Sequence, residues 1–196
     1  MKKVCFLASH LDSGASILFD IMHQNPRVEG YRLQKTYNHP LSLEMLTNQP
    51  HKCKNAAAIY LTELNHNYEF HCKALYSLCR FIYVIREPRS TLNKLMAIYK
   101  DDAATRYYCY RLRRLAEMAK RTPGAVFATW DDLVTGKMHP LLEQYLNLRQ
   151  PLQLEDYNQL RFANDNLIRR EYLEWAQDCY ERHLYFFKQQ NLIQVV

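Results

Sequence analysis

Residues 4–23 read VCFLASHLDSGASILFDIMH and carry three structural signals in succession. Residues 4–8 form a short apolar run, which predicts a buried strand. A serine–glycine pair follows at residues 13–14 and marks a tight turn. Residues 15–23 place their large apolar side chains on one side of a helix, which ends at the Asn-Pro pair of residues 25–26. The chain therefore opens with a strand, a tight loop and a helix.

The loop at residues 9–16 has the features of an anion-binding loop. A strand that leads through a short loop into a helix aims several backbone N–H groups at one point, and the helix dipole adds positive potential there. Gly14 lets a ligand approach the backbone, while Ser13 and Ser16 supply hydroxyl donors. The loop lacks the Gly-x-x-x-x-Gly-Lys-[Ser/Thr] pattern of nucleoside triphosphatases. Capping of the helix by Asp12 or Ser13 is an equally good interpretation of these residues.

The rest of the chain alternates strands with helices. Residues 28–54 are polar and predict a long loop with a short helix at 41–46. Strands are expected at residues 56–61, 80–85 and 124–129, and helices at 68–78, 89–99, 103–120, 138–146 and 165–189. This order predicts an α/β fold, in which one domain spans residues 1–196 and a central parallel sheet is flanked by helices, the C-terminal one long. Ligands of such sheets bind beyond the carboxyl ends of the strands, here residues 9–16, 63–67, 86–94 and 130–133.

Arg86 ends the strand predicted at residues 80–85. Its planar guanidinium can hold a phosphate through two hydrogen bonds. Lys94 follows in the next helix and can face the same edge of the sheet. An ion pair between Arg86 and a nearby acid, with Lys94 solvated, is the alternative.

Three segments together resemble the nucleotide-binding halves of sulfotransferases that use 3′-phosphoadenosine-5′-phosphosulfate. Residues 13–18, Ser-Gly-Ala-Ser-Ile-Leu, are similar to the family's Ser-Gly-[Thr/Ser]-[Thr/Ser] loop and Leu-rich helix. Residues 81–89 are similar to its apolar strand running into Arg-Asp-Pro-Arg, with Glu87 in place of the aspartate. Residues 130–133, Trp-Asp-Asp-Leu, are similar to its later Tyr-Glu-Asp-Leu strand end. In this order the segments cover most of the chain.

The resemblance implies a P-loop sulfotransferase fold and transfer of a sulfuryl group, without a metal, to a hydroxyl or amine of a small-molecule, glycan or peptide acceptor. Its implied donor-site residues are His10, Asp12, Ser13, Gly14, Ala15, Ser16, Arg86 and Lys94. Within this set the amides and hydroxyls of residues 13–16 would hold the 5′-phosphosulfate, and Arg86 would hold the 3′-phosphate. Lys94 stands where the family has a serine and would meet the phosphate as a point charge.

Asp12 departs from the family pattern, because the family has a basic residue before Ser-Gly. That cation stabilises the charge on the bridging oxygen as the sulfuryl group leaves, and an aspartate adds repulsion there. Either His10, Arg32 or Lys35 supplies the cation instead, or transfer is slow or absent.

The general base is also unlike the family's. In one branch a histidine stands some twenty residues before the strand-end arginine, which implies His66 as the catalytic base here. His39 is the reserve candidate. Another branch uses a glutamate after the first helix, where Glu29 is the nearest acid.

Composition restricts the remaining function classes. The net charge is +6, but no long run of Lys or Arg and no nucleic-acid motif occurs, and the cluster at Arg111, Arg113 and Arg114 predicts a solvated helix face. The six cysteines are scattered without a C-x-x-C pair, which is typical of a reducing compartment. No apolar stretch reaches the ~20 residues of a membrane span, so we expect a soluble, cytoplasmic protein. The alternatives are a nucleotide-binding protein of the same fold without catalysis, a small-molecule kinase, and a nucleic-acid binder supported by charge alone.

Overall fold

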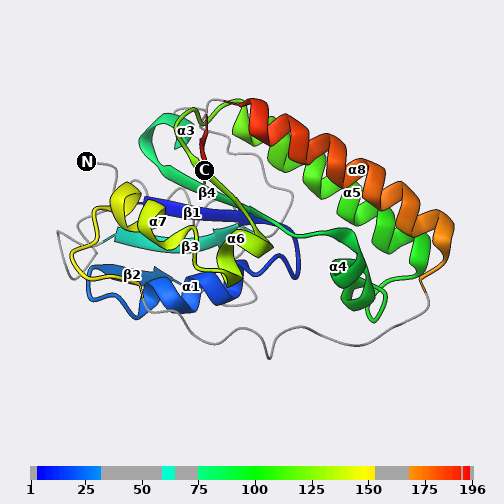
Figure 1. The fold of residues 1–196 in the computed structure, drawn as a ribbon, viewed down its shortest axis with the longest axis horizontal. Helices are drawn as coiled ribbons and strands as arrows, with labels where there is room; N and C mark the ends of the chain where they lie inside the picture. The colour runs from blue at the N-terminus through cyan, green and yellow to red at the C-terminus, as the bar shows by residue number, and fades with distance from the viewer. Residues whose placement is uncertain (1–3, 32–58, 65–74, 153–167, 191, 195–196) are drawn as a thin grey trace.

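The computed structural model describes residues 4–31, 59–64, 75–152, 168–190 and 192–194. In this part of the chain, strands form one sheet in the order β2-β3-β1-β4-β5-β6, and every neighbouring pair is parallel (Figure 1). The strands are β1 (Val4–Ser9), β2 (Val28–Tyr31), β3 (Ile59–Leu64), β4 (Arg80–Ile85), β5 (Val126–Thr129) and β6 (Ile193–Gln194). The helices are α1 (Ala15–His23), α3 (Leu75–Leu78), α4 (Pro88–Leu95), α5 (Asp101–Ala119), α6 (Trp130–Val134), α7 (His139–Leu146) and α8 (Arg170–Gln189).

Helices cover both faces of the sheet, so the central strands are apolar on both sides. In β1, Cys5 and Leu7 face α1, α6 and α7, whereas Phe6 and Ala8 face α3, α4, α5 and α8. Every side chain of β1 is buried, as expected for a parallel strand between two helical layers.

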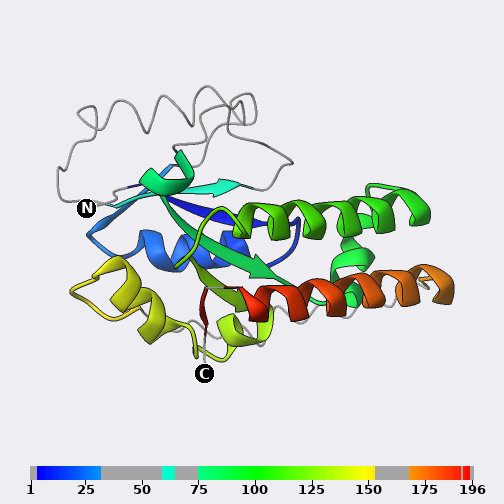
Figure 2. The ribbon, with the colours of Figure 1, turned by 90° about the horizontal axis from the view of Figure 1, so that it is seen from above.

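The helices α5 and α8 lie side by side over one face (Figures 1 and 2). Phe187 of α8 stacks on Phe127 of β5 with ring centroids 4.7 Å apart. Tyr108 and Leu112 of α5 are fully buried in the same core. The helices α5 and α8 therefore form the helical layer on this face, and their side chains pack against the strands.

The chain leaves β1 and β4 in opposite directions. From β1 it passes through α1 to β2, toward one edge of the sheet. From β4 it passes through α4 and α5 to β5, toward the other edge. Because β1 and β4 are neighbours, their carboxyl ends border a crevice at the point where the strand order reverses. Open α/β sheets bind their ligands at such a point.

The predicted α/β fold with a parallel sheet flanked by helices is confirmed. The helix at residues 15–23 and the strand at 80–85 have the predicted bounds. The prediction of a loop from residue 28 is wrong at its start, because Val28–Tyr31 pairs with β3 as an edge strand. Two short elements, α6 and β6, were not predicted. Among the described residues, no helix combines the length and apolarity needed to cross a membrane.

The expected strand at residues 56–61 lies farther along the chain, at Ile59–Leu64. Glu63 consequently lies inside β3 and pairs in register with Leu7, rather than following the strand. The expected short helix at residues 41–46 lies outside the described residues, as do the first parts of the helices expected at 68–78 and 165–189.

Candidate anion-binding site

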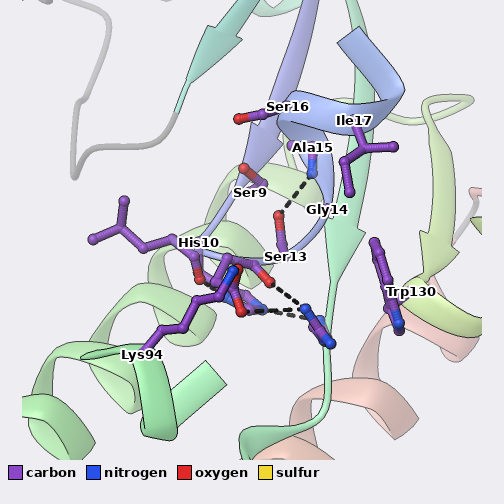
Figure 3. A pocket seen from close by; sticks show the side chains of 12 residues that line it. Ser9, His10, Ser13, Gly14, Ala15, Ser16, Ile17, Lys94 and Trp130 are labelled. Atoms are coloured by element: carbon purple, nitrogen blue, oxygen red, sulfur yellow. Dashed lines mark hydrogen bonds and ion pairs between the residues drawn. The ribbon is translucent and has the colours of Figure 1, made fainter. Parts of the chain in front are cut away.

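A pocket of about 350 Å³ opens at the crevice between β1 and β4 (Figure 3). Its walls are the loop after β1, the start of α1, the end of β4, the helix α4 and the first residue of α6. The lining residues are Ser9, His10, Leu11, Asp12, Ser13, Gly14, Ala15, Ser16, Ile17, Arg86, Lys94 and Trp130. The structure thus brings all eight predicted donor-site residues to one pocket.

The loop bends sharply at two residues with positive φ. Asp12 has φ 59° and Gly14 has φ 92°. A residue other than glycine rarely takes this conformation, although aspartate and asparagine do so more readily than most. A Cβ on Gly14 would lie 2.2 Å from a carbon of the Trp130 ring. Gly14 is therefore required both for its backbone angle and for the space that Trp130 occupies.

The first turn of α1 is not capped by an acidic side chain. Gly14 is the N-cap residue and makes no side-chain cap bond, while the Ser13 hydroxyl accepts a hydrogen bond from the Ala15 N–H at 3.3 Å (Figure 3). The capping alternative is thus wrong for Asp12, whose carboxylate pairs with Arg86 and Lys94. The start of α1 remains directed at the pocket, with its dipole toward any bound anion.

Asp12 instead pairs with both cations of the pocket. One carboxylate oxygen lies 3.2 Å from Arg86 Nη1, and the other contacts Lys94 Nζ. The Asp12 side chain is 15% exposed and that of Arg86 is 4% exposed, whereas Lys94 is 42% exposed. The alternative of an ion pair between Arg86 and a nearby acid is confirmed. The same alternative had Lys94 solvated, which is wrong, because Lys94 pairs with the same carboxylate.

Arg86 is held from several sides. Its guanidinium carbon lies 4.3 Å from the centroid of the Trp130 ring, a cation–π contact. Its backbone carbonyl accepts a hydrogen bond from the Tyr108 hydroxyl at 2.7 Å. The buried Nε–H of Arg86 has no hydrogen-bond partner among the described residues. A buried donor of this kind at the wall of a pocket is a natural partner for a ligand oxygen.

His10 is buried and electrically neutral. Its Nε2 accepts a hydrogen bond from the Arg86 backbone N–H at 2.9 Å, so its Nδ1–H donates to the Leu11 carbonyl at 2.8 Å. Burial, the largest cause, lowers the pKa of His10 to about 4, and the charges of Arg111 and Arg86 act in the same direction. The expectation that His10 replaces the missing loop cation is therefore wrong. It joins the loop to the end of β4 instead.

Arg111 corrects the sequence interpretation most clearly. The predicted solvated cluster is solvated at Arg113, but the Arg111 side chain is fully buried under the loop and its Nε–H donates to the Ser9 carbonyl at 2.7 Å. Burial, the largest cause, lowers the pKa of Arg111 to about 10, which leaves it charged at neutral pH. Arg111 thus adds positive charge close behind the pocket.

Tyr108 and Arg111 form a polar support that the sequence did not reveal. They lie three residues apart on one face of α5 and donate to the carbonyl of Arg86, directly after β4, and to that of Ser9, the last residue of β1. The carboxyl ends of neighbouring strands need such donors when a helix buries them. Trp130 was predicted only as part of a strand end, and its contacts with Gly14 and Arg86 also appear in the structure alone.

The remaining predicted site residues cannot be placed beside the pocket. His66, His39, Arg32 and Lys35 lie outside the described residues, so the catalytic role of His66 stays a prediction. Glu29 is in β2, at the far edge of the sheet and two strands from β1.

The pocket can bind an anion with several oxygens. Its lining carries two cations and one carboxylate, together with hydroxyl groups and the backbone at the start of α1. A ligand phosphate can replace the Asp12 carboxylate between Arg86 and Lys94, since both present oxygens to the same donors. The sequence matches no protein-family model and no curated protein.

Proposed function

We propose that this protein binds 3′-phosphoadenosine-5′-phosphosulfate in the pocket and transfers its sulfuryl group to a hydroxyl or amine acceptor, as sulfotransferases do. The observation that carries the proposal is the convergence of the loop after β1, Arg86 and Lys94 on one pocket between β1 and β4. The resemblance described above joins the same loop and the same arginine, although they are far apart in the sequence.

Each wall has a distinct task in this proposal. The backbone and hydroxyls of residues 13–16, at the start of α1, receive the 5′-phosphosulfate. Arg86 receives the 3′-phosphate through the edge of its guanidinium, while Trp130 holds the guanidinium face and fixes its plane. Lys94, on the more open side, adds a point charge. Asp12 must leave the two cations when the ligand enters.

Transfer by this site depends on placement and electrostatic stabilisation rather than on a protein nucleophile. The buried charge of Arg111 and the cations Arg86 and Lys94 favour an anion at the loop. His10 cannot act as the base, because both ring nitrogens are engaged and burial keeps it neutral. His66 remains the proposed base for the acceptor proton.

A second candidate is binding of the same nucleotide without transfer. The ion pairs of Asp12 favour it, because they place a carboxylate where the family has a cation. Incubation of the native chain with labelled donor and a panel of sugar, phenol, peptide and amine acceptors separates the candidates. Label on an acceptor supports the transferase, whereas tight binding without transfer supports the second candidate.

Calorimetry with 3′-phosphoadenosine-5′-phosphate and with ATP tests the binding proposal. We expect the bisphosphate to bind more tightly than ATP, and Arg86→Ala to weaken its binding by about 10- to 100-fold, the value of a charge-assisted contact of about 1.5–3 kcal/mol. Arg89→Ala is the matched control, because Arg89 is exposed, lies three residues after Arg86 and does not line the pocket.

Loss of folding in Arg86→Ala would confuse this result, so Arg86→Lys is measured beside it. The lysine keeps the charge opposite Asp12 but cannot form two parallel bonds, and we expect intermediate affinity. Preference for ATP, or equal affinity of the native, Arg86→Ala and Arg89→Ala proteins, would refute the proposal.

A further inference from the structure

Two thiols and an imidazole meet where α5 packs on α8. Cys109 of α5 and Cys179 of α8 lie against each other, and the Cys179 thiol donates a hydrogen bond to the Cys109 carbonyl oxygen at 3.8 Å. His183 follows one turn later on α8. Its Nδ1 lies 3.6 Å from Cys179 Sγ and donates to the Cys179 carbonyl at 2.7 Å.

The two thiols differ in acidity. The hydrogen bond from the Cys109 thiol is the largest cause that lowers the pKa of Cys179, to about 5, and His183 and Arg182 act in the same direction while burial opposes them. The same hydrogen bond raises the pKa of Cys109 far above its usual range. Within this pair Cys179 is therefore the sulfur that loses its proton more readily, and its contact with His183 raises the pKa of that imidazole.

Cys5 lies in a different environment. Cys5, fully buried in β1, has its pKa raised mainly by burial, which keeps it a thiol. A thiolate beside cationic groups is the reactive form of cysteine, whereas a buried thiol in apolar surroundings is inert. Cys179 has 9% of its surface exposed and Cys109 is partly exposed, so a molecule as small as a peroxide can reach the pair.

We propose that Cys109 and Cys179 form a peroxide-reactive dithiol that closes reversibly to a disulfide between α5 and α8. The Cys179 thiolate attacks one oxygen of hydrogen peroxide, the O–O bond breaks, and the leaving hydroxide takes a proton from His183 to become water. The Cys109 sulfur then attacks the sulfenic sulfur of Cys179, and its proton leaves with the hydroxyl group as a second water. Both sulfurs are oxidised, and the peroxide is reduced to two waters.

The position of this pair gives the disulfide a place in the fold. Cys109 directly follows Tyr108, whose hydroxyl holds the Arg86 carbonyl at the pocket. A bond between Cys109 and Cys179 therefore fixes to α8 the helix that supports the ends of β1 and β4. The proposal stands whether or not the pocket transfers sulfuryl groups.

Mass spectrometry of the full chain tests this proposal. The reduced protein is treated with hydrogen peroxide near neutral pH, its remaining thiols are alkylated, and it is digested without a reductant. We expect a peptide pair joined through Cys109 and Cys179, lighter by two hydrogens than the separate peptides, that dithiothreitol separates again. In Cys109→Ser we expect Cys179 to be trapped by a sulfenic-acid reagent, because its resolving partner is missing.

Two further variants keep the result independent of folding. Cys79→Ser removes a buried thiol of the same core, and we expect it to leave the cross-link unchanged. His183→Gln removes the ring that lies beside Cys179 and supplies the proton to the leaving hydroxide, and we expect the peroxide reaction to slow because the pKa of Cys179 rises. The loss approaches about tenfold per unit only where that pKa exceeds the ambient pH. The proposal is wrong if Cys109 and Cys179 stay reduced while Cys5 or Cys79 oxidises, or if Cys109→Ser yields no sulfenic acid in a protein with native circular dichroism.

Discussion

The loop after β1 and the turn after β4 form facing walls of one pocket, but they carry side chains of opposite charge. The loop contributes backbone shape, with positive φ at Asp12 and Gly14, and its one ionised side chain is an acid. The turn contributes the cation Arg86 on an ordinary backbone. The two walls therefore neutralise each other through the Asp12–Arg86 pair.

Glu87 explains why Arg86 pairs with the loop rather than with its own neighbour. The Glu87 carboxylate accepts hydrogen bonds from the backbone N–H groups of Arg89 and Ser90, at 2.6 and 3.1 Å, and caps α4. A carboxylate in this position also complements the helix dipole. Since that acid is occupied, Asp12 is the partner that reaches Arg86 and Lys94. Cation and counter-ion thus come from segments that only the fold brings together.

The largest expected effect comes from breaking the shape of the loop. Gly14→Ala forces an alanine to φ 92° and places its Cβ 2.2 Å from the Trp130 ring. We expect the free energy of unfolding to fall by about 4 kcal/mol, the sum of backbone strain and overpacking. Gly124→Ala is the control, because it shares the positive φ (75°) but its Cβ meets nothing within 4 Å, and about 1–2 kcal/mol is expected. Urea unfolding of both variants measures the difference, and equal losses would mean that Trp130 moves aside freely.

His10, which joins the loop to Arg86 through a hydrogen bond, should make the stability of the fold depend on pH. Its folded pKa of about 4 lies below the usual 6.5, so the unfolded chain binds a proton first as pH falls. The neutral, buried ring therefore stabilises the fold fully above pH 6.5, and we expect that contribution, about 3 kcal/mol, to be lost between pH 6.5 and pH 4. The free energy of unfolding of His10→Gln should change less with pH over this window than that of the native protein. Equal slopes for His10→Gln and the native protein would contradict the assignment.

The charge contrast itself is tested at Asp12. Asp12→Asn keeps a residue that tolerates φ 59° and removes the carboxylate that competes for Arg86 and Lys94. We expect the affinity for 3′-phosphoadenosine-5′-phosphate to rise about tenfold, or ~1.4 kcal/mol. Asp20→Asn, on the exposed side of α1, removes the same charge away from the pocket and should change little. If the pocket transfers sulfuryl groups, Asp12→Lys should also raise the transfer rate, and a native protein that is already fast would refute this view of Asp12.

Sequence reasoning succeeded where a local pattern decides the structure. The apolar run of residues 80–85 ends at Arg86-Glu87-Pro88, so β4 and the place of Arg86 followed directly. The bend at Ser13-Gly14 likewise predicted the loop and the start of α1. Asp12 was identified as anomalous for the same reason, since its position relative to Ser-Gly is fixed in the sequence.

Contacts between distant segments could not be predicted in the same way. Arg111 stands 102 residues from the Ser9 carbonyl that it holds, and its neighbours on α5 are charged, so composition favoured a solvated face. His10 was a candidate cation because no local pattern shows that its Nε2 accepts a hydrogen bond from the Arg86 N–H, 76 residues away. Burial and partner identity change the charge of such groups, and both are properties of the tertiary structure.

The smallest expected effect is at the support of the β4 wall. Tyr108→Phe removes the hydroxyl that donates to the Arg86 carbonyl at 2.7 Å and leaves that buried carbonyl without this donor. We expect the free energy of unfolding to fall by about 1 kcal/mol, as is usual for one buried hydrogen bond. Tyr110→Phe makes the same chemical change two residues later on an exposed side chain, and should be neutral. If neither variant changes the free energy of unfolding, the hydrogen bond from α5 does not stabilise the β4 wall, and the contrast between the two walls lies in the loop alone.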